Sequence, residues 1–239
     1  MLGRFHEISI QTPDIGASVA FYEGLGFTQA TTGDCWTHPY GVLTDGRIVL
    51  GLHQYRFPSP SLTFVRARIA AQVAPLEALG IRLAFAKTGE DCFNELGFRD
   101  PAGQMVTVLE ARTYSPFTRS RDETSLCGDF AEFSLPAADF ASGRRFWERF
   151  GFVALEQVEE PYLRLPLTSD HLDLAFHRPR TLDRPMLVFQ DTGMAERIAR
   201  IRERGVAVSD ELPRGLAPEH NALLLSPEGT SLLLLARDG

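Results

Sequence analysis

The chain has little cysteine and no long apolar run. Its 239 residues include three cysteines, Cys35, Cys92 and Cys127, which are unequally spaced and form no C-x-x-C pair. This argues against a disulfide framework or a zinc site, so each cysteine is expected to be a small buried hydrophobe. The longest apolar stretches, 223–225 and 232–235, are far too short to span a bilayer. The N-terminal residues run directly into a strand-like pattern without a signal peptide, which favours a cytoplasmic protein.

The chain also lacks an excess of positive charge. Its formal net charge is -7, which argues against a nucleic-acid partner and mildly favours neutral or cationic ligands. No serine or cysteine nucleophile is recognisable, and Gly24, Gly26 and Gly33 do not form a dinucleotide-binding signature. With 44% hydrophobic and 23% charged residues, the composition is that of an ordinary globular protein.

What the chain does contain is a long internal repeat. Motifs of the first half return 125 residues later: Glu7-Ile8-Ser9-Ile10 as Glu132-Phe133-Ser134-Leu135, Asp14 as Asp139, Phe21-Tyr22 as Phe146-Trp147, and Gly26-Phe27 as Gly151-Phe152. A repeat of this length is a duplicated module, because solenoid units have periods of about 20 to 50 residues. We therefore predict two modules, residues 1–112 and 128–239, joined by a linker at 113–127.

The hydrophobic pattern predicts a β-α-β-β-β order twice in the first module. Residues 5–12 alternate as a strand does, Asp14 is placed to cap the following helix, and Gly26 is placed to end it. A second helix is predicted at 70–79. The second half is expected to repeat this plan, with strands near 130–135 and 186–190, helices at 141–150 and 194–204, and a final hairpin through Gly229. Residues 212–220 are irregular, and two interpretations stay open: a lid over a pocket or a surface connection.

These motifs resemble the vicinal oxygen chelate superfamily, which includes glyoxalase I, extradiol dioxygenases, fosfomycin resistance enzymes and bleomycin resistance proteins. The resemblance rests on Asp14, Phe21-Tyr22, Leu25-Gly26-Phe27 and the Arg-Asp-Pro-x-Gly turn at 99–103, with a weaker copy in the second half. It implies an α+β fold in which tandem βαβββ units form two modules, each with a curved mixed sheet around a concave pocket. It is specific for fold and weak for reaction, since one fold hosts many chemistries.

The resemblance also implies where a metal would be held. Enzymes of the superfamily bind a divalent metal through His and Glu, at positions that fall here on Glu7, Gly51, Ser61 and Thr107, and in the second module on Glu132, Ala175, Met186 and Leu233. Each module offers one donor in four, whereas such sites need about three. We therefore predict no metal and no cofactor. His6, one step before Glu7, is expected to point to the opposite face; a register shifted by one would place it inside.

Glu7 and Glu132 are the main candidates for function. Both modules place a carboxylate at the same inward position, and Ser9 lies on the same face of its strand as Glu7. A carboxylate in an apolar pocket suits a general base or an amine-binding group. The alternative is a strand carboxylate held in an internal salt bridge or hydrogen bond.

His53 and His177 form the second candidate pair. Each lies two residues past a vacated ligand position, so each faces the pocket and is suited to hydrogen bonding or general base catalysis. A structural role is the alternative, and Glu7 with His53 could also form a two-donor metal site completed by water. Aromatic residues supply a surface on which a flat ligand can stack: Trp36, Tyr40, Tyr55 and Phe93, with Trp147, Tyr162 and Phe176 in the second module. Core packing is the alternative for these, and it is favoured for Trp147.

The sequence therefore favours a metal-free protein that binds a small aromatic or amine-bearing molecule, as bleomycin resistance proteins do. The alternatives are a metal-dependent lyase, isomerase or dioxygenase, and a metal-free enzyme with Glu7 or His53 as general base. The identity of the ligand, the module that binds it, and the choice between monomer and homodimer stay open at this stage.

Overall fold

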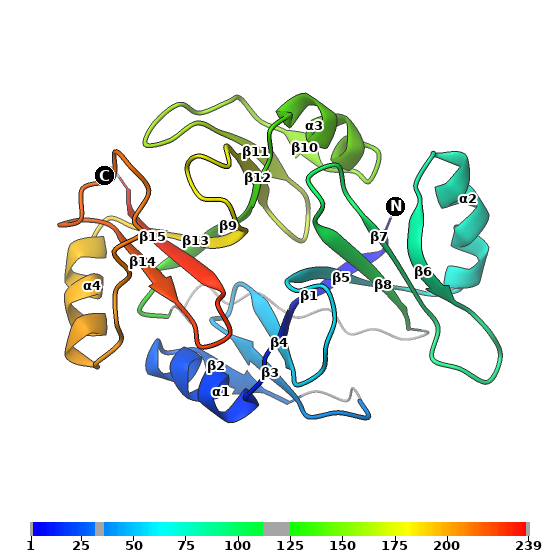
Figure 1. Ribbon diagram of the computed structural model, residues 1–239, viewed down its shortest axis with the longest axis horizontal. Helices are drawn as coiled ribbons and strands as arrows, with labels where there is room; N and C mark the ends of the chain where they lie inside the picture. The colour runs from blue at the N-terminus through cyan, green and yellow to red at the C-terminus, as the bar shows by residue number, and fades with distance from the viewer. Residues whose placement is uncertain (1, 32–35, 112–124, 238–239) are drawn as a thin grey trace.

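The computed structural model describes residues 2–31, 36–111 and 125–237, which form two mixed β-sheets with helices packed on them (Figure 1). The first module contains two βαβββ units, as predicted. The first unit comprises β1 (Arg4–Gln11), α1 (Ile15–Gly24), β2 (Thr28–Ala30), β3 (Tyr40–Thr44) and β4 (Val49–His53). The second comprises β5 (Ser61–Arg66), the 3-10 turn η1 (Ile69–Gln72), α2 (Val73–Ala78), β6 (Leu83–Lys87), β7 (Glu95–Arg99) and β8 (Met105–Glu110).

The eight strands of this sheet follow the order β2-β3-β4-β1-β5-β8-β7-β6. The central strands β1 and β5 are antiparallel, and each pairs in parallel with the last strand of its own unit, β4 or β8. The two units are therefore related by a local two-fold arrangement between β1 and β5.

The second module repeats this arrangement with seven strands in the order β10-β11-β12-β9-β13-β15-β14. Its first unit comprises β9 (Asp129–Pro136), α3 (Phe140–Glu148), β10 (Val153–Ala154), β11 (Arg164–Thr168) and β12 (Leu174–His177). Its second comprises β13 (Met186–Asp191), α4 (Met194–Glu203), β14 (Ala222–Leu225) and β15 (Ser231–Ala236). The second unit is one strand short of the predicted plan, because the segment after α4 pairs with β14 only through an isolated bridge between Ser209 and Leu223.

Local signals in the sequence place the helices as predicted. The side chain of Asp14 accepts a hydrogen bond from the Ala17 amide at 3.1 Å, and Asp139 caps α3 in the same way. Gly26 and Gly151 follow the two helices with φ of 89° and 92°, a left-handed conformation that glycine adopts without a steric penalty.

The repeated aromatic residues hold the two modules together. Tyr22 of α1 donates a hydrogen bond to Glu228 in the β14–β15 turn at 2.8 Å, and Trp147 of α3 donates one to Asp100 in the β7–β8 turn at 3.0 Å. Both rings are fully buried, and one hydrophobic core runs through both modules. The duplicated motifs therefore build a two-fold junction, and the prediction that Trp147 packs in the core is confirmed.

Strand β1 presents two different faces. Ile8 and Ile10 pack in the hydrophobic core, whereas Glu7 and Ser9 lie on the opposite face, which we call the Glu7 face. The expectation for His6 was wrong: the register between β1 and β5 shifts between Phe5 and Glu7, and this irregularity brings His6 Nε2 within 3.8 Å of the Glu7 carboxylate.

Two of the three cysteines can be compared with the prediction. Cys127 is buried, and burial raises the pKa of its thiol to about 12. Cys92 is exposed, so the prediction was wrong for this residue, which lies in a loop and hydrogen-bonds Asn94 at 3.2 Å. Cys35 and most of the predicted linker lie outside the described residues. In the part of the chain that the structure describes, no helix is long and apolar enough to cross a membrane.

Candidate functional site

The Glu7 carboxylate lies at the centre of a buried polar network on the first sheet. It accepts hydrogen bonds from Ser9 Oγ at 2.6 Å, Tyr40 Oη at 2.6 Å and His53 Nε2 at 2.9 Å. Ser9 also bonds Thr63 Oγ1 at 2.7 Å. Burial opposes ionisation, but the His53 hydrogen bond, the nearby histidine charges and the Ser9 hydroxyl outweigh it and hold the pKa of Glu7 below its ordinary value. Glu7 is therefore an anion at neutral pH.

A chain of hydrogen bonds connects this anion with the protein surface. The other ring nitrogen of His53, Nδ1, lies 3.0 Å from Nε2 of His38. Because ionised Glu7 accepts from His53 Nε2, the neutral form of His53 accepts at Nδ1 from His38 Nε2–H. This leaves Nδ1 of His38 with a lone pair. Burial and the charge of His53 lower the pKa of His38, which is only partly buried, so it is neutral at pH 7.

Aromatic side chains surround the outer end of this chain. The His38 ring stacks on Tyr55 with a centroid separation of 5.0 Å and an interplanar angle of 19°. Trp36 lies edge-on to His53 at 5.0 Å and contacts Phe93 at 5.7 Å. Tyr55 and Phe93 are 60% and 51% exposed, which is high for large aromatic side chains. We call Trp36, His38, Tyr55 and Phe93 the aromatic rim.

The position of the Glu7 carboxylate depends on the glycine opposite it. A Cβ atom at Gly51 would lie 2.1 Å from the Glu7 carboxylate atoms, so the carboxylate occupies the space of the missing side chain. Gly51 pairs with Ser9 across β4 and β1, and its counterpart in the second module is Ala175, which pairs with Ser134.

The equivalent network in the second module is connected differently. Arg164, the counterpart of Tyr40, donates a hydrogen bond to Glu132 at 2.6 Å. His177 instead contacts Ser134 at 2.8 Å and donates to the Leu182 carbonyl at 2.9 Å. At the position that corresponds to Gly51, Ala175 carries a methyl group. The twin carboxylates therefore have different partners.

Burial dominates the electrostatics of this second site. It raises the pKa of Glu132 to about 7 despite the Arg164 charge, and it lowers the pKa of His177 to about 4. Three buried polar atoms of this second site have no hydrogen-bond partner among the described residues: Glu132 Oε1, Arg164 Nε and Tyr162 Oη.

An apolar cluster packs over the equivalent face of the second sheet. Leu216 belongs to it and Leu212 packs against it, which supports the interpretation of 212–220 as a lid. The other buried members are Tyr162, Leu182, Met186, Val188, Leu223, Leu233 and Leu235.

Extradiol dioxygenases are among the solved structures that superpose on this chain. A catechol 2,3-dioxygenase superposes with a TM-score of 0.59 at 13% identity, over 98% of this chain and 88% of that chain. Homoprotocatechuate 2,3-dioxygenase from Brevibacterium fuscum, as its E323L mutant, gives a TM-score of 0.63 at 16% identity, over 99% of this chain and 72% of that chain. Homoprotocatechuate 2,3-dioxygenase from Arthrobacter globiformis gives a TM-score of 0.62 at 16% identity, over 99% of this chain and 80% of that chain.

The chain has the two-module vicinal oxygen chelate fold. This confirms the predicted α+β class and the resemblance read from the motifs. No family model matches the sequence, and no curated protein matches it either. At these identities the likeness establishes the fold and leaves the reaction open.

The residues at the metal positions of this fold do not fit a divalent metal. In the first module the Glu7 carboxylate is occupied by three donors, Gly51 has no side chain, and Ser61 and Thr107 bond each other at 2.8 Å. In the second module a guanidinium, Arg164, lies against the remaining carboxylate. Among the described residues no three His, Cys, Asp or Glu side chains form a group that could hold a metal ion.

The structure brings most of the predicted site residues together. Glu7, Ser9, Tyr40 and His53 share one network, whereas Trp36, Tyr55 and Phe93 lie at its outer edge. In the second module Glu132 and His177 lie on neighbouring strands but make no hydrogen bond to each other.

Three important residues were missing from the prediction. His38 lies between Trp36 and Tyr40, two residues predicted to form an aromatic surface, and its alternation with Tyr40 marks it as pocket-facing. Thr63 and Arg164 carry no sequence signal of their own. Arg164 is found only by matching β11 with β3, where it takes the place of Tyr40 opposite a histidine.

Proposed function

We propose that the first module is a metal-free binding site for a small aromatic molecule that carries an amine. The observation that supports this most is the His38–Tyr55 stack at an exposed rim, connected through His53 to the ionised Glu7. A planar ligand extends such a stack, and a cation is attracted to both the ring faces and the buried negative charge.

The electrostatics of the site support a cationic ligand. Within the described part of the chain, the ion-pair partners of Glu7 are His6 and His53, with no lysine or arginine among them. When these histidines are neutral, the site retains a negative charge in a poorly solvated place, where its attraction for a cation is stronger than in water. The net charge of -7 acts in the same direction at long range.

Calorimetric titration with 2-phenylethylamine and with its neutral analogue 2-phenylethanol tests the proposal. The amine is expected to bind more tightly, and Tyr55→Ala to weaken it about three- to fivefold, the size of an exposed cation–π contact. Leu155→Ala is a matched control, since Leu155 is 51% exposed and lies in the other module. Equal affinity for amine and alcohol, or equal effects of the two substitutions, would contradict the proposal. Elemental analysis of the purified protein tests the metal-free part.

The Glu7–His53–His38 chain favours a second candidate, a metal-free enzyme in which His38 is the general base. A carboxylate that orients one histidine, which in turn orients an accessible base, is a common arrangement for proton abstraction. The expected sign is exchange of an acidic ligand C–H for deuterium in D₂O, followed by NMR. His38→Gln should stop the exchange while ligand still binds. Binding without any exchange leaves the binding protein as the function.

A further inference from the structure

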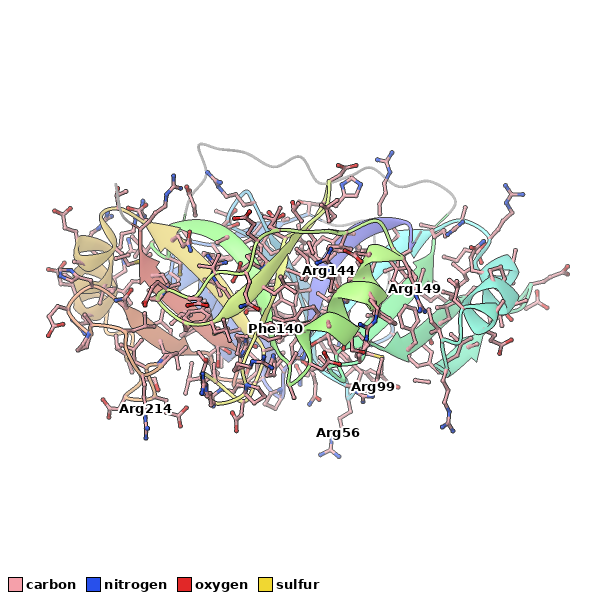
Figure 2. The ribbon with its side chains drawn as sticks, turned by 90° about the horizontal axis from the view of Figure 1, so that it is seen from above. Arg56, Arg99, Phe140, Arg144, Arg149 and Arg214 are labelled. Atoms are coloured by element: carbon pink, nitrogen blue, oxygen red, sulfur yellow. The ribbon has the colours of Figure 1, made fainter. Side chains whose placement is uncertain are left out.

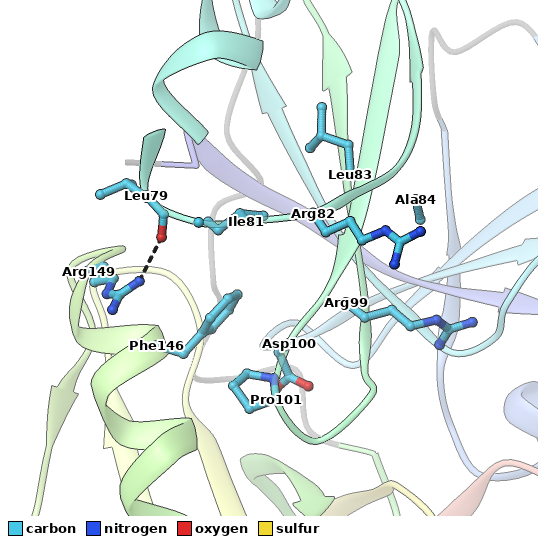
Figure 3. Close-up of a pocket in the computed structure, with 11 residues that line it drawn as sticks. Leu79, Ile81, Arg82, Leu83, Ala84, Arg99, Asp100, Pro101, Phe146 and Arg149 are labelled. Atoms are coloured by element: carbon cyan, nitrogen blue, oxygen red, sulfur yellow. Dashed lines mark hydrogen bonds between the residues drawn. The ribbon is translucent and has the colours of Figure 1, made fainter. Parts of the chain in front are cut away.

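A second cleft, separate from the Glu7 face, lies at the junction of the modules. It has a volume of about 470 Å³ and separates α3 from the loop after α2, strand β6 and the β7–β8 turn (Figure 3). This is within the range of small-molecule sites, about 300 to 1,000 Å³. Its apolar lining consists of Leu79, Ile81, Leu83, Ala84, Pro101 and Phe146.

Three arginines line this cleft, and none of them has a carboxylate partner among the described residues. Arg149 donates to the Leu79 carbonyl at 3.1 Å and Arg99 to the Gly103 carbonyl at 2.7 Å, whereas Arg82 makes no hydrogen bond or ion pair with any described residue. Figure 2 and Figure 3 show Arg149 at the end of α3. In a chain with a net charge of -7, such a concentration of unpaired cations marks a place suited to an anion.

The acid in the lining does not neutralise these arginines. Asp100 accepts the Ala102 and Gln104 amides on Oδ1 and the Trp147 indole on Oδ2. Burial raises its pKa, although these hydrogen bonds oppose the rise. Its oxygens therefore point into the junction, and the open side of the cleft is left cationic.

Phe146 gives the cleft a fixed aromatic wall. Its ring is half-buried and packs against Phe98, Trp147 and Phe150, with centroid separations of 6.1, 5.6 and 5.2 Å. Figure 3 shows Phe146 and Arg149 coming from α3, with Arg82 and Arg99 coming from the first module. A ligand between them would contact both modules.

We propose that this cleft binds an aromatic carboxylate. A guanidinium presents two parallel donors that match a carboxylate, and the Phe146 and Pro101 surfaces accept a planar ring. The arginine side chains are exposed, so a charge contact alone would be weak. Burial of the ring on the apolar lining supplies the additional free energy.

Titration with benzoate, at low ionic strength and followed by calorimetry, tests this site. Benzamide is the neutral analogue of the same shape and is expected to bind about tenfold more weakly. Arg82→Glu should weaken benzoate about tenfold, and added salt should do the same for the wild type. Arg82 is exposed, and the substitution removes no hydrogen bond or ion pair among the residues that the structure describes.

Arg145→Glu is the matched control, since Arg145 lies on α3, is exposed and does not line the cleft. It changes the net charge equally and should leave the affinity for benzoate within about twofold. Equal affinity for benzoate and benzamide, an unchanged Arg82→Glu variant, or no saturable binding up to about 10 mM benzoate would overturn the proposal. So would loss of benzoate binding in Tyr55→Ala, which would place the ligand at the aromatic rim instead.

Discussion

Replacing Gly51 by alanine tests the origin of the Glu7 network most directly. The new Cβ atom would lie 2.1 Å from the Glu7 carboxylate, well inside van der Waals contact. The carboxylate is at the end of a flexible side chain, so it can move without displacing the backbone. The cost then comes from the hydrogen bonds that it loses. Among the described residues, Glu132, beside Ala175, accepts a hydrogen bond from one side chain where Glu7 accepts from three, so we expect two to be lost.

Each hydrogen bond to a charged group contributes about 1.5 to 3 kcal/mol, so Gly51→Ala should lower the free energy of unfolding by about 3 kcal/mol or more. The assay is urea unfolding at pH 7, with the pKa of Glu7 followed by NMR. We expect that pKa to rise, because burial would no longer be balanced by His53. A loss below about 0.5 kcal/mol with an unchanged pKa would refute the reasoning.

The pH dependence of stability should change sign in this variant. In the wild type the folded pKa of Glu7 is below 4.5, so its contribution is present above that value and is lost as pH falls through the folded pKa. In Gly51→Ala the folded pKa is raised above 4.5, so stability should instead fall as pH rises from about 4.5 toward the new value. Adding Tyr40→Arg copies Ala175 and Arg164 of the second module, and should recover part of the loss at pH 7.

Three further outcomes are expected. Folding raises the pKa of Glu132 from 4.5 to about 7, so the free energy of unfolding should decline by about 3 kcal/mol as pH rises through this window. Urea unfolding at successive pH values should show that Glu132→Gln removes this decline. Folding lowers the pKa of His177 from 6.5 to about 4, so the free energy of unfolding should fall by about 3 kcal/mol as pH falls through this window. In His177→Asn this pH-dependent fall should be absent. The two residues change the free energy of unfolding with pH in opposite directions, so each variant should show the pH dependence that the other residue causes. Parallel stability–pH profiles of the two variants would contradict both pKa shifts. Tyr22→Phe removes the hydrogen bond to Glu228 and should cost about 1.5 to 3 kcal/mol, against no change for Tyr55→Phe at the exposed rim.

The motifs that could be read from the sequence are those that build the fold. Asp14 and Gly26 act locally, through a helix cap and a left-handed residue, so their effect follows from neighbouring residues alone. The aromatic pair Tyr22 and Trp147 recurs because the junction is two-fold. Their partners Glu228 and Asp100 are more than 40 residues away in the sequence, and only the folded chain connects them.

The site was harder to predict because it depends on contacts between strands. Strand alternation placed Glu7 and His53 on one face correctly, but it could not reveal the irregularity in β1 that brings His6 to the same carboxylate. Nor could a pattern of side chains show the importance of Gly51, where the relevant feature is an absent methyl group. The absence of a strand before β14 also depends on contacts between distant segments. Leu212 and Leu216 of the segment 212–220 pack on the apolar cluster, and the chain after α4 pairs with β14 only through one isolated bridge.

The difference between Gly51 and Ala175 is the reason why we place the proposed binding site in the first module. Over Gly51 the carboxylate reaches a histidine, and through it a second histidine at an exposed aromatic rim. Over Ala175 the same carboxylate meets an arginine, the histidine bonds a backbone carbonyl, and leucines pack over the face. The Glu132 charge is compensated by a guanidinium and covered by leucines, whereas the Glu7 carboxylate has hydroxyl and histidine partners and is connected to the exposed rim. Gly51 and Ala175 occupy matching positions in the two modules, and the different surroundings of the two carboxylates support the binding site that we propose in the first module.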